Sequence, residues 1–258
     1  MSGKKIGGAG LRGQSAGETS ICTVGVSGSG LTYRGYDVVD LAENTTFEEV
    51  AYLLLKGKLP NSQELKAYIE KLKTLRGLQP ELRSTLEGIP KTAHPMDVLR
   101  TGCSVLGNLE QEEGFINQTD HADRMLSAFP SILSYWYQYS HYGKRIDTET
   151  DDDTIGGHFL HLLHGKKPSQ LHDQVMSISL ILYAEHEFNA STFAARVCAS
   201  TLSDIHSAVT SAIGTLRGPL HGGANEAASA MLSQWNDPDV AEAELLKMLA
   251  QKQLVMGF

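Results

Sequence analysis

The sequence predicts an all-α fold with one short β-hairpin near its N-terminus. From residue 45 onward, apolar residues recur at the three- and four-residue spacing of amphipathic helices, and Gly, Pro, Asn and Asp separate the successive segments. Convincing strand signals are confined to residues 21–36. No helix-pair unit of constant length recurs, which argues against a solenoid. The 258 residues are enough to bury one large core or two unequal ones.

The strand signals lie in the segments ICTVGV and LTYRGY, which flank Ser27–Gly30. Both segments are short and rich in Ile, Val, Thr and Tyr, which is typical of paired strands. The glycines of GVSGSG also suggest a phosphate loop. That motif requires a strand, the glycine fingerprint and a helix within one βαβ unit, and no such unit follows. We therefore expect a hairpin here.

Capping patterns predict the helix boundaries. Thr46 and Glu49 form a capping-box pattern ahead of a helix over 47–56. Ser62 is the expected N-cap of the following helix, which runs to about residue 75. Further helices are expected at 81–87, 95–107, 119–141, 152–164, 168–187, 191–213, 224–235 and 238–252.

Charge and composition exclude several classes of function. The formal net charge is −8, so the chain lacks the basic surface that binds nucleic acid or an anionic membrane. Cys22, Cys103 and Cys198 are odd in number and form no CxxC pair, which indicates reduced thiols rather than disulfides or a zinc site. The sequence shows no apolar leader and no run of about eighteen apolar residues, so we expect a soluble, cytoplasmic protein.

Ten histidines raise the question of a metal site. His158, His161 and His164 fall near one face of the helix GGHFLHLLHG. Metal-binding helices more often pair histidines at i and i+4 with a carboxylate, and this helix is otherwise strongly apolar. We therefore expect these histidines to be structural and expect no bound metal. Asp151–Asp153 are expected to cap the same helix and to interact with its dipole.

The segment YAEHEFNAST, residues 183–192, interrupts the helical pattern. The preceding helix is expected to end in His186, and Asn189 and Ser191 are expected to start the next one. Such a junction places an imidazole beside the backbone N–H groups of a helix start, which suits a carboxylate ligand. The alternative is a histidine that only caps a helix, and the segment alone leaves both interpretations open.

The segment LRGPLHGGANE contains the strongest candidate for an active-site histidine. Gly218-Pro219 end one helix, His221 lies on the turn, and Gly222-Gly223 allow close backbone approach before a helix that starts at Ala224. The positive end of a helix dipole favours a neutral imidazole, which can donate a hydrogen bond to a developing oxyanion. A histidine that only serves the turn is the alternative.

Several motifs occur together in the order found in the citrate synthase family. They are LTYRGYDVVDL, GKLP, HPMDVLRTG, AEHEFNAST, LRGPLHGGANE and the terminal MGF. On these motifs the chain resembles the citrate synthase family from about residue 9 onward. The short N-terminal region, YWYQYSHYGKRI and GGHFLHLLHG are most similar to the branch of bacterial 2-methylcitrate synthases.

The resemblance implies an all-α homodimer that joins an acyl-CoA to oxaloacetate without a permanently bound cofactor. In the family a carboxylate removes the α-proton, one histidine stabilises the enol, a second assists attack on the keto carbonyl, and the thioester is then hydrolysed. His221 matches the enol-stabilising histidine. His186 matches the histidine that binds oxaloacetate, with Asn189 and Ser191 in support. The segment that passes coenzyme A is matched by Leu254, Val255, Met256, Gly257 and Phe258.

The same resemblance assigns residues 1–220 to a large helical domain and residues 221–258 to the start of a small one. In the family the second catalytic histidine, the catalytic aspartate and most carboxylate-binding arginines follow the MGF motif. They do not occur in the sequence up to Phe258, so the chain as written is expected to be inactive on its own.

The expected reaction condenses propionyl-CoA with oxaloacetate and water to 2-methylcitrate and CoA, as in propionate catabolism. Citrate synthesis from acetyl-CoA is the alternative, because the one methylene that separates the two substrates is worth only about 1–3 kcal/mol in a pocket. A second alternative, from another class, is a non-catalytic helical dimerisation module.

Overall fold

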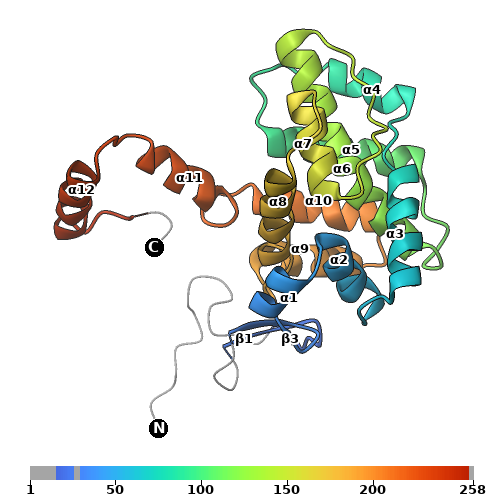
Figure 1. Ribbon diagram of the computed structural model, residues 1–258, viewed down its shortest axis with the longest axis horizontal. Coiled ribbons are helices and arrows are strands. Elements are labelled where there is room, and N and C mark those ends of the chain that lie inside the picture. The colour runs from blue at the N-terminus through green and yellow to red at the C-terminus, as the bar shows by residue number, and fades with distance from the viewer. Residues whose placement is uncertain (1–15, 26–29, 256–258) are drawn as a thin grey trace.

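The fold is a body of packed helices with a small antiparallel sheet at one end, as the computed structural model shows for residues 16–25 and 30–255 (Figure 1). The predicted all-α architecture with an N-terminal hairpin is confirmed. The elements are β1 (Cys22–Val24), β2 (Leu31–Tyr33), β3 (Tyr36–Asp37), α1 (Val38–Asn44), α2 (Phe47–Lys56), α3 (Ser62–Thr74), α4 (Pro80–Glu87), α5 (Pro95–Leu109), α6 (Gln118–Tyr142), α7 (Ile155–His164), α8 (Gln170–Leu182), α9 (Ala190–Ala199), α10 (Ile205–Leu216), α11 (Gly223–Leu232) and α12 (Pro238–Ala250).

The strands pair in the order β1-β2-β3. Tyr33 lies opposite Tyr36, so Arg34 and Gly35 form a two-residue turn between β2 and β3. Both turn residues have positive φ, 50° and 90°, as the tight hairpin turn requires. Asp37 then caps α1 by accepting from two backbone N–H groups, a helix that the sequence pattern did not predict.

Two hydrophobic clusters hold the helical body together. One lies among α4, α5, α6 and α10 and includes Ile132 and Ile213. The other joins the sheet to α1, α2, α3, α7 and α8 and includes Tyr33 and Ile181. The helices α8 and α10 are thus anchored in different clusters, and each leads directly into one of the segments singled out for function.

The single helix predicted over 191–213 is wrong, because the structure divides it into α9 and α10. Ser200 and Thr201 turn their hydroxyl groups back onto carbonyl oxygens of the last turn of α9, and Leu202 takes a left-handed φ of 62°. Asp204 then caps α10 by accepting from a backbone N–H at 2.9 Å. Hydrogen bonds from these polar side chains to the nearby backbone therefore end α9 and start α10, where one continuous helix was expected.

The expected N-cap of α3 is also wrong by one residue. Asn61, rather than Ser62, accepts hydrogen bonds from two backbone N–H groups of the first turn, both at 2.9 Å. Its neighbour Ser62 is already helical. Asparagine is among the most favourable N-cap residues, and its amide oxygen reaches two donors at once.

Helices α11 and α12 extend away from the body beyond the end of α10 (Figure 1). Met231 is the one residue of α11 that is buried, and α12 buries none. Among the described segments, no helix combines the length and apolar character needed to cross a membrane.

Candidate active site

The residues singled out from two separate segments line one cavity of about 1160 Å³. His186 and Asn189 come from the junction between α8 and α9, and His221 comes from the turn between α10 and α11. The third wall is the start of α5, with His94 and Met96. Residues far apart in the chain therefore share a single concave site, which is the usual form of a small-molecule site.

The turn that carries His221 depends on two glycines. A Cβ atom on Gly222 would lie 2.7 Å from the carbonyl oxygen of Leu216, and one on Gly223 would lie 2.9 Å from that of Gly218. The backbone N–H groups of His221 and Gly223 both donate to the Gly218 oxygen, at 3.0 and 3.2 Å. The expected close approach is confirmed, and α11 starts one residue earlier than predicted, at Gly223.

Ser191 fixes the orientation of the His221 ring. The His221 Nε2 atom lies 3.3 Å from the backbone nitrogen of Ser191 and 2.8 Å from its hydroxyl oxygen. A backbone N–H can only donate, so Nε2 is the acceptor. A neutral imidazole then carries its hydrogen on Nδ1, which is left to donate to a substrate.

Asn189 begins α9, as the sequence predicts. Its Oδ1 accepts from the Thr192 backbone N–H at 2.9 Å and from the Ser191 hydroxyl at 2.8 Å. Since the cap occupies the amide oxygen, the amide hydrogens on Nδ2 are what Asn189 can offer to a ligand in the cavity.

The prediction that the preceding helix ends in His186 is wrong, because α8 ends at Leu182. The cause is the buried Tyr33 of β2. Its hydroxyl donates to the carbonyl of Ile181 at 2.9 Å and accepts from the backbone N–H of Glu185 at 3.3 Å. These two groups would bond to each other in a continuing helix, so the hydroxyl interrupts the ladder. His186 thereby lies on a non-helical segment with its side chain exposed.

The N-terminal sheet also holds the residue that follows His186. Glu187 has a left-handed φ of 54°, a conformation that costs about 1–3 kcal/mol and persists only where the surroundings enforce it. Its carboxylate accepts from the backbone N–H of Val24 in β1 at 3.0 Å. Burial raises the pKa of the adjacent Glu185 carboxyl. Sheet contacts thus define the shape of the junction.

The first turn of α11 also contacts the opposite walls. His94 Nε2 lies 2.9 Å from an Oε atom of Glu226, and Asn225 Nδ2 donates to the Tyr183 hydroxyl at 3.1 Å. His94 is also the N-cap of α5. Its place in the cavity depends on a residue 132 positions away in the chain, and no local pattern reveals that pairing.

Two of the α7 histidines, His158 and His161, form hydrogen bonds remote from this cavity, and His164 is exposed. His158 is buried between the hydroxyls of Ser131 and Thr150, at 3.0 and 2.9 Å. Burial lowers its pKa to about 3. His161 contacts Asp152 at 2.7 Å. Over residues 16–25 and 30–255, no three His, Cys, Asp or Glu side chains group as a metal site would require.

The prediction that Asp151–Asp153 cap α7 is wrong. Thr154 is the N-cap, and its hydroxyl oxygen accepts from the Gly157 backbone N–H at 2.8 Å. Asp152 instead contacts His161. Asp153 forms an ion pair with Lys73 of α3 at 2.6 Å. Asp152 and Asp153 therefore interact with side chains rather than with the backbone N–H groups at the N-terminus of α7.

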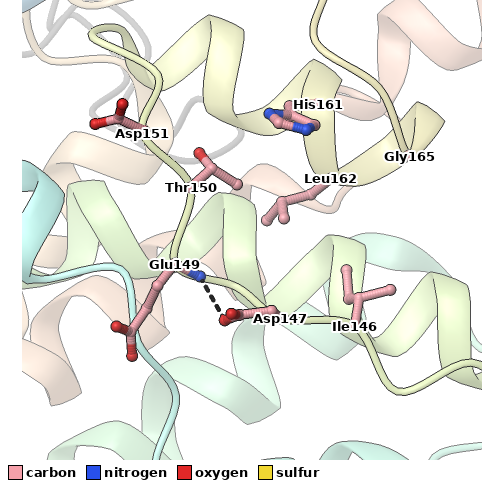
Figure 2. A pocket seen from close by; sticks show the side chains of 8 residues that line it. All are labelled: Ile146, Asp147, Glu149, Thr150, Asp151, His161, Leu162 and Gly165. Carbon is pink, nitrogen blue, oxygen red and sulfur yellow. Dashed lines mark hydrogen bonds between the residues drawn. The ribbon is translucent and has the colours of Figure 1, made fainter.

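A smaller cavity of about 390 Å³ lies beside α7 and has several acidic residues on its wall (Figure 2). Figure 2 shows that the carboxylates of Glu149 and Asp151 point in different directions. Asp147 accepts from the backbone N–H of Glu149 at 3.0 Å. Because the carboxylates do not converge on one point, this cavity is not arranged to bind a cation.

Of the predicted coenzyme A segment, only Leu254 and Val255 are described. They follow α12 and are not part of the cavity wall. Met256, Gly257 and Phe258 lie outside the described residues. The role of this segment stays a prediction.

Comparisons with known proteins agree with the fold. The family model described as "Citrate synthase, C-terminal domain" matches residues 10–258. The 2-methylcitrate synthase of Shewanella oneidensis is 68% identical over 255 residues, which cover 99% of this chain and 68% of that protein. The 2-methylcitrate synthase 1 of Corynebacterium glutamicum is 40% identical over 258 residues and covers 96% of this chain and 67% of that protein.

Solved structures show the same similarity. The citrate synthase of Thermotoga maritima has a TM-score of 0.82 at 38% identity, and the match covers 96% of this chain and 66% of that one. A Thermoplasma acidophilum citrate synthase in complex with carboxymethyl coenzyme A and oxaloacetate has a TM-score of 0.87 at 29% identity, covering 94% and 65%. The chain belongs to the citrate synthase family of enzymes and spans about two thirds of the length of these relatives.

Proposed function

We propose that this chain is part of an acyltransferase that condenses propionyl-CoA with oxaloacetate and water to give 2-methylcitrate and CoA. The observation that carries this proposal is the 68% identity to a 2-methylcitrate synthase over 99% of the chain. Identity to proteins named citrate synthase is lower, 37% for that of Heyndrickxia coagulans and 39% for citrate synthase 2 of Bacillus subtilis. The reaction places the protein in propionate catabolism.

In this proposal His221 stabilises the enol of the acyl-CoA. Removal of the α-proton transfers negative charge to the thioester oxygen, and a hydrogen-bond donor placed there lowers the barrier. The acceptor role of Nε2 toward Ser191 supports Nδ1–H as that donor. A neutral donor stabilises the developing charge without first forming an ion pair with the bound substrate.

We propose that His186 and Asn189 bind oxaloacetate. Both line the cavity with His221, and both can present N–H groups to the carboxylate and keto oxygens of this dianion. The exposed imidazole of His186 extends from a segment whose backbone the N-terminal sheet holds. Oxaloacetate bound there would lie beside the acyl group polarised by His221.

We further propose a division of the chain into two domains, a coenzyme A segment and a dimeric assembly. Residues 1–220 form the large domain and residues 221–258 start the small one, a division supported by the projection of α11 and α12 from the body (Figure 1). Leu254–Phe258 pass the coenzyme A of the acyl-CoA co-substrate, and no cofactor is permanently bound. The protein acts as a cytoplasmic homodimer.

Steady-state kinetics of the full-length protein with the two acyl-CoA substrates test the proposal. We expect kcat/KM for propionyl-CoA to exceed that for acetyl-CoA by about 10-fold or more, within the 10–200-fold that one methylene can supply. A preference for acetyl-CoA would favour citrate synthesis instead. Absence of condensation with either substrate would contradict the enzymatic proposal and favour the dimerisation module.

A further inference from the structure

Side-chain hydrogen bonds connect the His221 turn and the first turn of α11 to the helical body at three places. Among the described residues, the side-chain hydrogen bonds between residues 221–255 and the body involve Ser191, Tyr183 and His94. Apolar packing adds little, because Met231 is the one buried residue of α11. Polar contacts therefore determine how this turn sits against the cavity.

The contact of His94 with Glu226 is set by the start of α5. The backbone N–H of Met96 donates to His94 Nδ1 at 3.1 Å, which makes Nδ1 an acceptor. The hydrogen of the neutral ring is then on Nε2, and Nε2 lies 2.9 Å from the Glu226 carboxylate. The same tautomer of His94 therefore caps α5 through Nδ1 and donates to Glu226 through Nε2.

The position of Glu226 links this contact to the turn that carries His221. It lies in the first turn of α11, where the helix dipole favours a carboxylate, and five positions after His221. A hydrogen bond to an ionised acceptor is stronger than one between neutral groups. Holding Glu226 therefore fixes the start of α11 and, through the short Gly222-Gly223 segment, the position of His221.

We propose that His94 and Glu226 are positioning residues for His221: together they hold the 218–226 turn against α5. The proposal rests on the proposed role of His221 and adds to it the device that keeps this residue in place. Neither side chain is assigned to the reacting atoms. Their loss should slow the chemical step through misplacement of His221, to which reactions of this kind are highly sensitive.

Three substitutions separate this role from a general structural one. His94→Asn keeps a good N-cap for α5 but is too short to reach Glu226. Glu226→Ala removes the acceptor, whereas Glu226→Gln retains an oxygen that can accept from Nε2–H. Glu242→Ala, at an exposed position of α12, is the matched control.

In the full-length protein we expect His94→Asn and Glu226→Ala each to lower kcat for condensation about 10-fold, with KM for oxaloacetate within about twofold of the unsubstituted enzyme. The double variant should be no slower than either single variant, because both remove the same interaction. Glu226→Gln should recover most of the activity, and Glu242→Ala should have no effect. Unchanged kcat in the single variants, additive losses in the double variant, or no recovery in Glu226→Gln would overturn the proposal.

Amide hydrogen exchange over residues 218–226 gives a readout that does not depend on catalysis. Exchange should accelerate in His94→Asn and Glu226→Ala and remain slow in Glu226→Gln and Glu242→Ala. If the enzyme condenses neither acyl-CoA, the proposed function fails while this measurement still tests the contact. Equal exchange in all variants would overturn the positioning role even in an active enzyme.

Discussion

At the scale of single residues, the chemistry of the site depends on which imidazole nitrogen each histidine has available. Ser191 engages Nε2 of His221, and Met96 engages Nδ1 of His94, so the two rings present opposite nitrogens as donors. The sequence places both histidines next to helix starts, and the partner that selects the His94 tautomer is local, whereas that of His221 comes from the fold. In His221 the partner lies 30 positions away.

His186 should contribute to oxaloacetate affinity rather than to the chemical step. We expect His186→Ala to raise the dissociation constant of oxaloacetate about 10-fold or more, the loss expected for one hydrogen bond to a charged group. Isothermal titration calorimetry on the full-length protein measures this directly. His172→Ala, at an exposed position of α8, is the control, and unchanged affinity in His186→Ala would contradict the assignment.

His158 should make the stability of the protein depend on pH. Its folded pKa of about 3 lies below the ordinary value of 6.5, so the unfolded chain binds the proton more readily. The stabilisation is therefore complete above about pH 6.5 and is lost as the pH falls toward 3. From pH 6.5 to 5 this one residue should reduce the free energy of unfolding by about 1.5 kcal/mol.

Urea unfolding of the His158→Gln variant at pH 6.5 and pH 5 tests this dependence. The variant should be less stable than the original at pH 6.5, because it loses a buried, fully bonded ring, but it should lose less stability on acidification. His206 is a second buried histidine whose pKa is lowered by burial, so part of the dependence should remain. An equal pH dependence in both proteins would be inconsistent with a neutral, buried His158.

At the scale of elements, the small sheet has a larger role than its length suggests, because the Tyr33 hydroxyl ends α8 and shapes the His186 junction. Tyr33→Phe leaves the half-buried Glu185 N–H without this partner, whereas the Ile181 carbonyl keeps its bond from the Ala184 N–H, so the loss should be about 1–2 kcal/mol in the free energy of unfolding. Denaturant unfolding measures the loss, and Tyr36→Phe, at an exposed position of β3, is the control. Equal stability of the two variants would show that the hydroxyl does not hold the junction.

Local patterns predicted most helices, but not where tertiary contacts override them. The capping box at Thr46 starts α2 as expected, and α5 begins at residue 95 as predicted. The early end of α8 depends on Tyr33, 148 positions from the Ile181 carbonyl it contacts. Ser200, Thr201 and Asp204 could have indicated the break between α9 and α10. Apolar residues continue at helical spacing across this break, so the pattern favoured a single helix.

At the scale of the whole molecule, the site is assembled from helices that belong to two hydrophobic clusters. Ile181 anchors α8 in one and Ile213 anchors α10 in the other, so the relative position of His186 and His221 depends on how the clusters pack. The sequence identified both histidines by local turn chemistry and family motifs. That they face one cavity with His94 could not follow from spacing, because three distant segments meet there.

We propose that His221 acts on the acyl-CoA while oxaloacetate is held by other residues of the same cavity. The most direct test compares His221→Ala with the unsubstituted full-length protein in CoA release from propionyl-CoA and in oxaloacetate binding, with the exposed His164→Ala as control. We expect His221→Ala to slow condensation by about 10²–10⁴-fold, the contribution typical of such a group, and to leave the oxaloacetate dissociation constant within about twofold. Near-normal condensation in His221→Ala, or loss of oxaloacetate binding in parallel with activity, would contradict the claim.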